Sequence, residues 1–354
     1  WNKKYNEKIK KGYVDQTHLV QDLIQKEKPR GKDGYKEIEN KVIAEIVQRL
    51  QDMAHQKIQA NYKVSSQQVT QAMVDEAQKV IDKLMQREEV EDFNNTLLEL
   101  FSVIPRKMGN VNDYLSRSKE DFARILKDEQ DLLDVMRGQV VTHTVQDEPD
   151  TDDVEEKQET IIEAMGLEFE EATEDDVRMI KSLLGDCRDK FYRAWRVKNI
   201  KTQKRFDEFV NKEHISKTKL LWHGSRNENW WSIINTGLVL RPTNAVITGK
   251  MFGFGIYYAP KARKSLGYTS LSGSYWARGN SNSAFMALMD VAYGKPYDVH
   301  SFDSKYYDFN YERLQKTCPG ANCLHAHAGS MLRNDEIIVY KEDQCTIKYL
   351  VELR

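Results

Sequence analysis

The segment KLLWHGS at residues 219–225 ends a buried-strand pattern in an imidazole, a glycine and a hydroxyl. This pattern predicts that His223 and Gly224 emerge where a strand meets a loop. Glycine lets a planar ligand approach the main-chain N–H and C=O, and a carboxamide needs one of each. Alone the signal is weak, because a single histidine at a strand end is more often structural than catalytic.

A second segment, GFGIYYA at residues 253–259, is followed by KSLGY at residues 264–268. Tyr257 and Tyr268, with Ser265 between them, predict a sandwich around an aromatic ring and a hydrogen bond to its substituent. The alternative is an aromatic-rich strand and a turn. The glycines form neither GxGxxG nor GxxxxGK[ST], so the sequence supports neither a Rossmann fold nor a nucleoside triphosphatase.

The third segment is NDEIIVY at residues 334–340, where Glu336 begins a strand that otherwise has a buried pattern. A carboxylate in such a place needs a partner, and a substrate hydroxyl would be a suitable one.

In this order, the three segments resemble the catalytic domain of poly(ADP-ribose) polymerases, the diphtheria-toxin-like ADP-ribosyltransferases. The family carries a His, Tyr, Glu triad on three separate strands, which His223, Tyr257 and Glu336 match. RPTNAVITGKMFG at 241–253 resembles the family's donor loop, and KYLVEL at 348–353 resembles its closing strand. The resemblance implies that NAD+ is the substrate and that no metal is required.

The resemblance also implies a role for each matching residue. The Gly224 backbone and the Ser265 hydroxyl would hold the nicotinamide carboxamide, with Tyr268 stacked on the ring. His223 would contact the adenine-side ribose, and Glu336 the 2′-hydroxyl of the nicotinamide ribose. The predicted residues are Glu336, His223 and Tyr257 for catalysis; His223, Gly224, Ser225, Tyr257, Ser265, Tyr268 and Arg241 for NAD+ binding; and Met251 on the acceptor side.

The expected reaction cleaves the bond between nicotinamide and ribose and transfers ADP-ribose to an acceptor. Family members that lack the glutamate are usually limited to single transfers, so Glu336 favours a polymerase. A mono-ADP-ribosyltransferase and a non-catalytic NAD+- or DNA-binding module remain alternatives, although the intact triad argues against the latter.

Composition sets the broad class. The 354 residues are 40% hydrophobic and 31% charged, which predicts a soluble globular protein with at least two domains. The net charge of −2 gives no global attraction to nucleic acid. Four cysteines and the absence of long apolar runs predict a reducing intracellular compartment. The family resemblance implies the nucleus in a eukaryote and the cytoplasm otherwise. Because the chain begins at Trp1, we expect it to be a fragment.

The fold class expected is α+β, with an all-α helical bundle before a mixed, mainly antiparallel β domain. Apolar stripes predict helices across 37–137, with a capping box at Ser65 and Gln68 and a helix end at Gly138. Thr173 and Asp176 are expected to cap a helix through residue 184. A strand is predicted at 191–200, and two more around a polar turn at 341–344.

Four regions are predicted: residues 1–26 as the tail of a WGR domain and a linker, 27–143 as a helical regulatory domain, 144–160 as an acidic linker, and 161–354 as the catalytic domain. FSVIPR and LLDVMRG resemble the regulatory helices of the DNA-responsive members. This resemblance implies protein acceptors, including the chain itself, and DNA breaks as partners bound N-terminally. The helices are expected to shield the NAD+ site until DNA binds; the alternative is a stabilising scaffold.

Two features depart from the family pattern. Lys250 stands where nuclear members carry an aromatic residue. Cys318, Cys323, His325 and His327 form C-x4-C-x-H-x-H, which contains four zinc-competent groups at a spacing unlike that of a standard finger. A zinc site and a reduced loop both remain open for these four, and the predicted catalytic site includes no metal.

Overall fold

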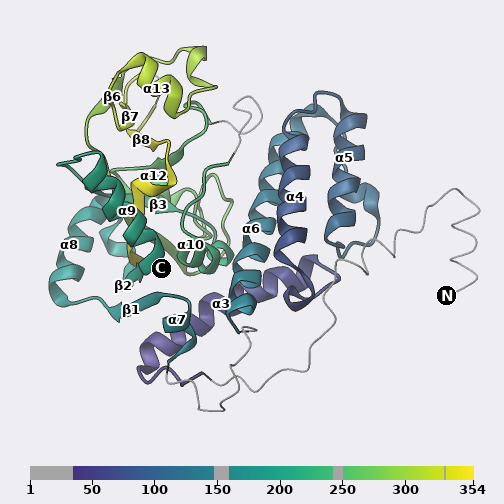
Figure 1. Cartoon of the computed structure of the whole chain (residues 1–354), viewed down its shortest axis with the longest axis horizontal. Coiled ribbons are helices and arrows are strands. Elements are labelled where there is room, and N and C mark those ends of the chain that lie inside the picture. The colour runs from purple at the N-terminus through teal and green to yellow at the C-terminus, as the bar shows by residue number, and fades with distance from the viewer. Residues whose placement is uncertain (1–34, 147–158, 242–249, 331) are drawn as a thin grey trace, which may run out of the picture.

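The structure is a computed structural model that describes residues 35–146, 159–241, 250–330 and 332–354 (Figure 1). The predicted WGR tail and residues 147–158 of the predicted acidic linker lie outside the described residues. Among the described helices, none combines the length and the hydropathy that a membrane span requires.

The N-terminal half is helical, as predicted. Its apolar stripes meet in one core that includes Ile46, Leu50, Val80 and Leu97. The Ser65–Gln68 capping box is present, but it caps a single 3-10 turn, and Thr70 caps the helix that follows. The helices are α3 (Lys41–Asn61), α4 (Gln71–Leu84), α5 (Val90–Val103) and α6 (Phe122–Gln146).

The C-terminal half is α+β, which confirms the predicted class. The Thr173–Asp176 box caps α8, and the strand expected at 191–200 is β2. The helices are α7 (Ile161–Ala164), α8 (Glu174–Leu184), α9 (Ile200–Lys212), α10 (Trp230–Thr236), α12 (Ala262–Leu266) and α13 (Tyr311–Thr317). The strands are β1 (Leu167–Glu171), β2 (Phe191–Asn199), β3 (Lys219–Gly224), β4 (Ile256–Tyr258), β5 (Ala284–Val291), β6 (Pro296–Val299), β7 (Cys323–Ala326), β8 (Glu336–Val339) and β9 (Cys345–Leu353).

These strands form two sheets. One has the order β1-β2-β9-β5-β3 and is antiparallel throughout, so β3 lies at its edge. The other has the order β4-β8-β7-β6, with only β6 and β7 parallel. The two strands expected around the polar turn are β8 and β9. They do not pair with each other, because each joins a different sheet.

The prediction that Gly138 ends a helix is wrong, because α6 continues through it to Gln146. A Cβ atom at Gly138 would lie 2.6 Å from both Cα and Cβ of Ser232 on α10. The glycine therefore allows two helices to approach closely, and it does so in the middle of one of them.

The helical and the α+β halves share one core around this contact. Trp231 of α10 is fully buried and donates a hydrogen bond from Nε1 to Thr142 Oγ1 on α6, at 3.0 Å. On α3, Arg49 pairs with the buried Glu352 of β9 at 2.8 Å. Figure 1 shows α3 running beneath the sheets while α4, α5 and α6 stand beside them. The helices are thus packed onto the α+β half by apolar, polar and ionic contacts.

We predict that Gly138→Ala lowers the free energy of unfolding. Alanine in a helix interior usually stabilises by about 0.5–1 kcal/mol relative to glycine. Forcing a methyl group into the backbone of Ser232 costs about 1–3 kcal/mol, which outweighs that gain. The measurement is chemical denaturation, with Gly109→Ala as the control, because nothing lies within 4 Å of a Cβ built there. A stabilised Gly138→Ala protein would show that the two helices separate easily.

Candidate active site

The candidate site forms where the edge strand β3 meets the end of β4. Trp222 and Ala259 exchange two backbone hydrogen bonds, of 2.9 and 3.0 Å, and so join the two sheets. Trp222 itself is fully buried. All three segments singled out in the sequence converge on this junction, since β8 pairs with β4.

His223 is held as a neutral imidazole. Its Nδ1 lies 3.1 Å from the carbonyl oxygen of Tyr257, which can only accept, so Nδ1 carries the proton. Burial lowers the pKa of His223 to about 4. At neutral pH, Nε2 is therefore left as an acceptor that suits a hydroxyl group.

Gly224 presents its main chain at the open edge of β3. Alternate residues of an antiparallel strand direct their N–H and C=O to the same side. Trp222 uses that side for Ala259, so Gly224, two residues on, faces the same edge. A Cβ at Gly224 would lie 2.0 Å from the carbonyl oxygen of Ser265 on α12, so only glycine fits.

Ser265 completes a carboxamide-sized set of polar groups. The residue is buried, and its hydroxyl donates to the Trp222 carbonyl at 3.1 Å. The oxygen of that hydroxyl can still accept, and rotation would turn its proton toward a ligand. Together with the Gly224 main chain, this offers both donors and acceptors to a planar amide.

The two tyrosines differ in their surroundings. The Tyr257 hydroxyl accepts from the Phe252 N–H and donates to the Gly253 carbonyl, both at 3.1 Å, so only its ring is available. Tyr268 is 38% exposed and lies parallel to Trp276, with ring centroids 6.2 Å apart. Burial and the nearby Glu336 carboxylate raise the pKa of Tyr268 to about 12.

Glu336 begins β8 and forms an ion pair with Lys264 of α12. Both side chains are nearly buried, at 13% and 15% exposure. The sequence predicts no role for Lys264, although this residue directly precedes Ser265. Its position in KSLGY is the only sequence signal for it, because a lysine on a short helix is ordinarily a solvated residue.

Three other predicted site residues have partners within the protein. Ser225 Oγ accepts a 2.9 Å hydrogen bond from Asn229. Arg241 pairs with Asp134 of α6, its guanidinium 2.6 Å from the carboxylate. Met251 packs partly buried against the apolar cluster that contains Phe252. The structure thus places Arg241 in the interface with the helical half, where it is not free to meet a ligand.

Lys250 lies over the ring of Tyr257, with Nζ 5.4 Å from the centroid. Burial, together with the nearby charge of Arg241, lowers the pKa of Lys250 to about 8, although Asp131 and Asp134 of α6 act in the opposite direction. Residues 242–249 of the predicted donor loop lie outside the described residues.

The C-x4-C-x-H-x-H residues do not converge on one point. Cys323 donates its thiol to the Tyr293 carbonyl at 3.3 Å, and Cys318 follows α13. His325 and His327 stack on each other, with centroids 4.0 Å apart. Among the described residues, these two histidines are grouped with Asp298 and with neither cysteine.

The known proteins that this chain matches include poly(ADP-ribose) polymerases and a viral protein similar to them. The model of the poly(ADP-ribose) polymerase catalytic domain matches residues 174–354. A poly(ADP-ribose) polymerase-like protein, 100L, of invertebrate iridescent virus 6 is 31% identical over 168 residues, which cover 47% of this chain and 87% of the viral one. Poly(ADP-ribose) polymerase 2 of maize is 28% identical over 60% of the chain, and poly(ADP-ribose) polymerase 1 of chicken is 24% identical over 82%. The chain spans 32% and 30% of the lengths of these two.

We predict that Ser265→Ala weakens the binding of benzamide, a minimal aromatic carboxamide. Loss of one hydrogen bond that leaves its partner unsatisfied costs about 1–3 kcal/mol, or about 5- to 150-fold in Kd. Calorimetric titration measures the change, and Ser272→Ala is the matched control, because that hydroxyl binds the Ser281 carbonyl at an exposed position. Equal benzamide affinity in wild type and Ser265→Ala would remove Ser265 from the site.

Proposed function

The chain belongs to the poly(ADP-ribose) polymerase catalytic-domain family of NAD+-dependent ADP-ribosyltransferases, and on that premise we propose that it extends ADP-ribose into polymer. It cleaves the nicotinamide–ribose bond and transfers ADP-ribose to protein, including itself, and then to ADP-ribose already attached. One observation carries the proposal: the Glu336 carboxylate is nearly buried at the start of β8 and lies close to the aromatic groups of the site.

In the proposed complex, nicotinamide lies along the open edge of β3. The Gly224 main chain and the Ser265 hydroxyl bind the carboxamide, and the ring lies between Tyr257 and Tyr268. The two hydrogen bonds of the Tyr257 hydroxyl to the main chain hold its ring in one position, so the ring can pack against one face of nicotinamide. Tyr268, which is partly exposed, closes the other face.

His223 orients the rest of the substrate. Because Nδ1–H is held by the Tyr257 carbonyl, Nε2 is aimed as an acceptor for a hydroxyl of the adenine-side ribose. The depressed pKa keeps this acceptor unprotonated throughout the physiological range. A charged imidazolium in this place would lose the acceptor and repel Lys250.

Glu336 stabilises the charge that develops during cleavage. Breaking the glycosidic bond leaves positive charge at ribose C1′, and a nearby carboxylate stabilises that state more than the ground state. The same carboxylate can hydrogen-bond an incoming hydroxyl, which elongation requires. Lys264 pairs with Glu336, and in the proposed complex the ribose 2′-hydroxyl would share the carboxylate with this lysine.

The helical half, predicted at 27–143, regulates access in this proposal. Arg241, an expected NAD+-binding residue, is held by Asp134 of α6, and Arg226 lies 3.8 Å from Asp128 of the same helix. We propose that DNA breaks, bound by the part of the chain before the helices, loosen these contacts in the nucleus. A ligand that shifts such an equilibrium must bind the open state more tightly.

We predict that Glu336→Gln keeps NAD+ affinity within a few-fold and lowers polymer formation by about 100-fold or more, the scale of losing one charge-stabilising group. Gel analysis of labelled product measures polymer, and calorimetry measures NAD+ binding. Glu342→Gln is the control, because it makes the same change on the turn after β8. Long polymer made by Glu336→Gln at the wild-type rate would reject the assignment. Single transfers by the wild type would favour the mono-ADP-ribosyltransferase.

We predict that Asp134→Asn raises basal nicotinamide release about three- to tenfold and lowers KM for NAD+. Removing the charge that holds Arg241 shifts the closed state by about 1 kcal/mol. Asp75→Asn is the matched control, since Asp75 on α4 meets Arg137 within the helical half. If Asp134→Asn and Asp75→Asn show the same rate, the helices act as a scaffold only.

A further inference from the structure

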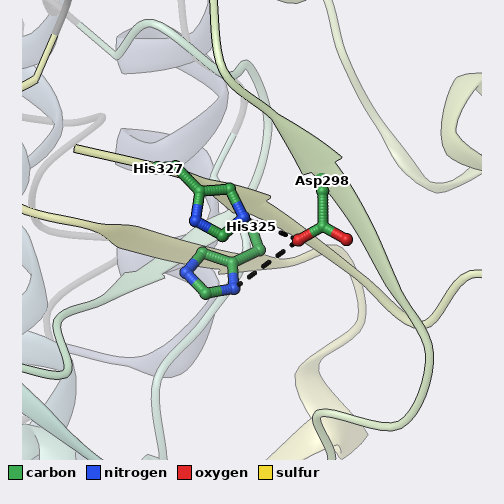
Figure 2. A group of neighbouring side chains, drawn as sticks. All are labelled: Asp298, His325 and His327. Atoms are coloured by element: carbon green, nitrogen blue, oxygen red, sulfur yellow. Dashed lines mark hydrogen bonds and ion pairs between the residues drawn. The ribbon is translucent and has the colours of Figure 1, made fainter. Parts of the chain in front are cut away.

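A cluster of histidine and aspartate side chains lies on the smaller sheet, outside the proposed NAD+ site. β6 and β7 are parallel, and their register places Asp298 beside His325. His327 follows β7 on the same face as His325, because residues two apart on an extended chain share a face. Figure 2 shows the carboxylate of Asp298 directed at both imidazole rings.

The distances within this cluster match a metal-coordinating set. One ligand atom from each of the three residues lies within 4.8 Å of the other two. Asp298 Oδ1 is 2.7 Å from His327 Nε2 and 3.9 Å from His325 Nδ1. Metal–ligand bonds of about 2.0–2.1 Å in a tetrahedral site require ligand atoms about 3.4 Å apart. These two separations bracket that value. The two imidazoles are stacked at 19°, so their rings would rotate for both lone pairs to meet one ion.

Hydrogen bonds and stacking with neighbouring residues orient these candidate ligands. His325 Nε2 lies 2.9 Å from Asp335 Oδ2, so it donates its proton there and leaves Nδ1 as the acceptor. The Tyr293 hydroxyl contacts this Nδ1 at 2.8 Å, and a bound metal ion would replace that hydroxyl. Asp335 is fixed in turn, because its other oxygen accepts the Ala328 N–H at 2.8 Å. His300 stacks on His327, with centroids 4.4 Å apart. A metal-binding histidine usually donates its second N–H to a carboxylate in this way.

From this geometry we propose that Asp298, His325 and His327 bind a divalent transition-metal ion, zinc in the first instance, with water as a fourth ligand. Two imidazoles and one carboxylate suit zinc and its neighbours better than calcium or magnesium, which prefer oxygen ligands throughout. The exposed fraction of Asp298, 49%, leaves an entry path from solvent. This donor set differs from C-x4-C-x-H-x-H, since it replaces both cysteines with Asp298.

The proposed ion is structural and takes no part in ADP-ribosyl transfer. It would tie β6 to β7 and, through Asp335, to the start of β8. Asp335 and Glu336 are consecutive, and their side chains point to different partners: Asp335 to the histidines, Glu336 to Lys264. The metal therefore lies on the other side of the chain from the proposed catalytic carboxylate.

The test uses the full chain without an affinity tag, treated with chelator and dialysed. Titration with Co2+ followed by visible absorption reports stoichiometry and coordination, and competition by Zn2+ gives its affinity. We expect one ion per chain, the intense d–d bands of four-coordinate Co2+ without a thiolate charge-transfer band, micromolar or tighter zinc binding, and a higher Tm in the loaded protein.

Three variants identify the donors. Asp298→Asn and His327→Ala should abolish the four-coordinate spectrum, and Asp335→Asn should weaken Zn2+ binding about 10- to 100-fold. His55→Ala, at an exposed position on α3, is the control and should bind like the wild type. Circular dichroism verifies that each variant is folded, and the half-exposed Asp298→Asn changes one charge without changing shape.

Each contrary result would overturn the proposal. No binding of Co2+ or Zn2+ would leave the cluster as a hydrogen-bonded group alone. Unchanged binding in both Asp298→Asn and His327→Ala would place the ion elsewhere. A thiolate band that disappears in Cys323→Ser would replace the proposed donors by a cysteine-containing set.

Discussion

The pair of backbone hydrogen bonds between Trp222 and Ala259 is the constraint on which the candidate site depends. It joins the edge of one sheet to the end of the other. Once those two residues are in register, the Tyr257 carbonyl comes within reach of His223, and Ser265 comes against Gly224. A main-chain junction is insensitive to side-chain motion, so groups from three distant segments keep a fixed geometry. The close approach of Ser265 leaves no room for a side chain at Gly224.

Much of this architecture could be predicted from sequence because its signals are local. The Thr173–Asp176 capping box and the alternation in β2 each act within a few residues, and both were predicted correctly. Gly138 was misinterpreted because the reason for it lies on α10, far away in the chain. The ion pairs of Lys264 and Arg241 were missed for the same reason. The triad segments could be assembled from their resemblance to a family, but the roles of the individual residues stay predictions.

Charge neutralisation links the two halves of the molecule. Lys264 pairs with Glu336, and Arg241 pairs with Asp134. The first pair lies within the catalytic half, so a substrate hydroxyl can share the carboxylate without any element moving. The second pair crosses to α6, so in the proposed complex Arg241 reaches the substrate only by giving up Asp134, whose side chain is 32% exposed. Separation leaves the mostly buried guanidinium of Arg241 without its ion-pair partner, which is costly and makes the second contact the better place for the proposed regulation.

The consecutive residues Asp335 and Glu336 connect the histidine cluster directly to the proposed catalytic carboxylate. Asp335 is fixed by His325 and by the Ala328 N–H, whereas Glu336 has Lys264 as its ion-pair partner. Because one peptide unit connects them, any displacement of the histidine cluster changes the backbone at the start of β8. The pairing of β7 with β8 resists that change, since His325 lies opposite Ile337 and Ala326 opposite Glu336. The position of the proposed catalytic carboxylate of Glu336 therefore depends on the contact between Asp335 and His325 as well as on its own ion pair with Lys264.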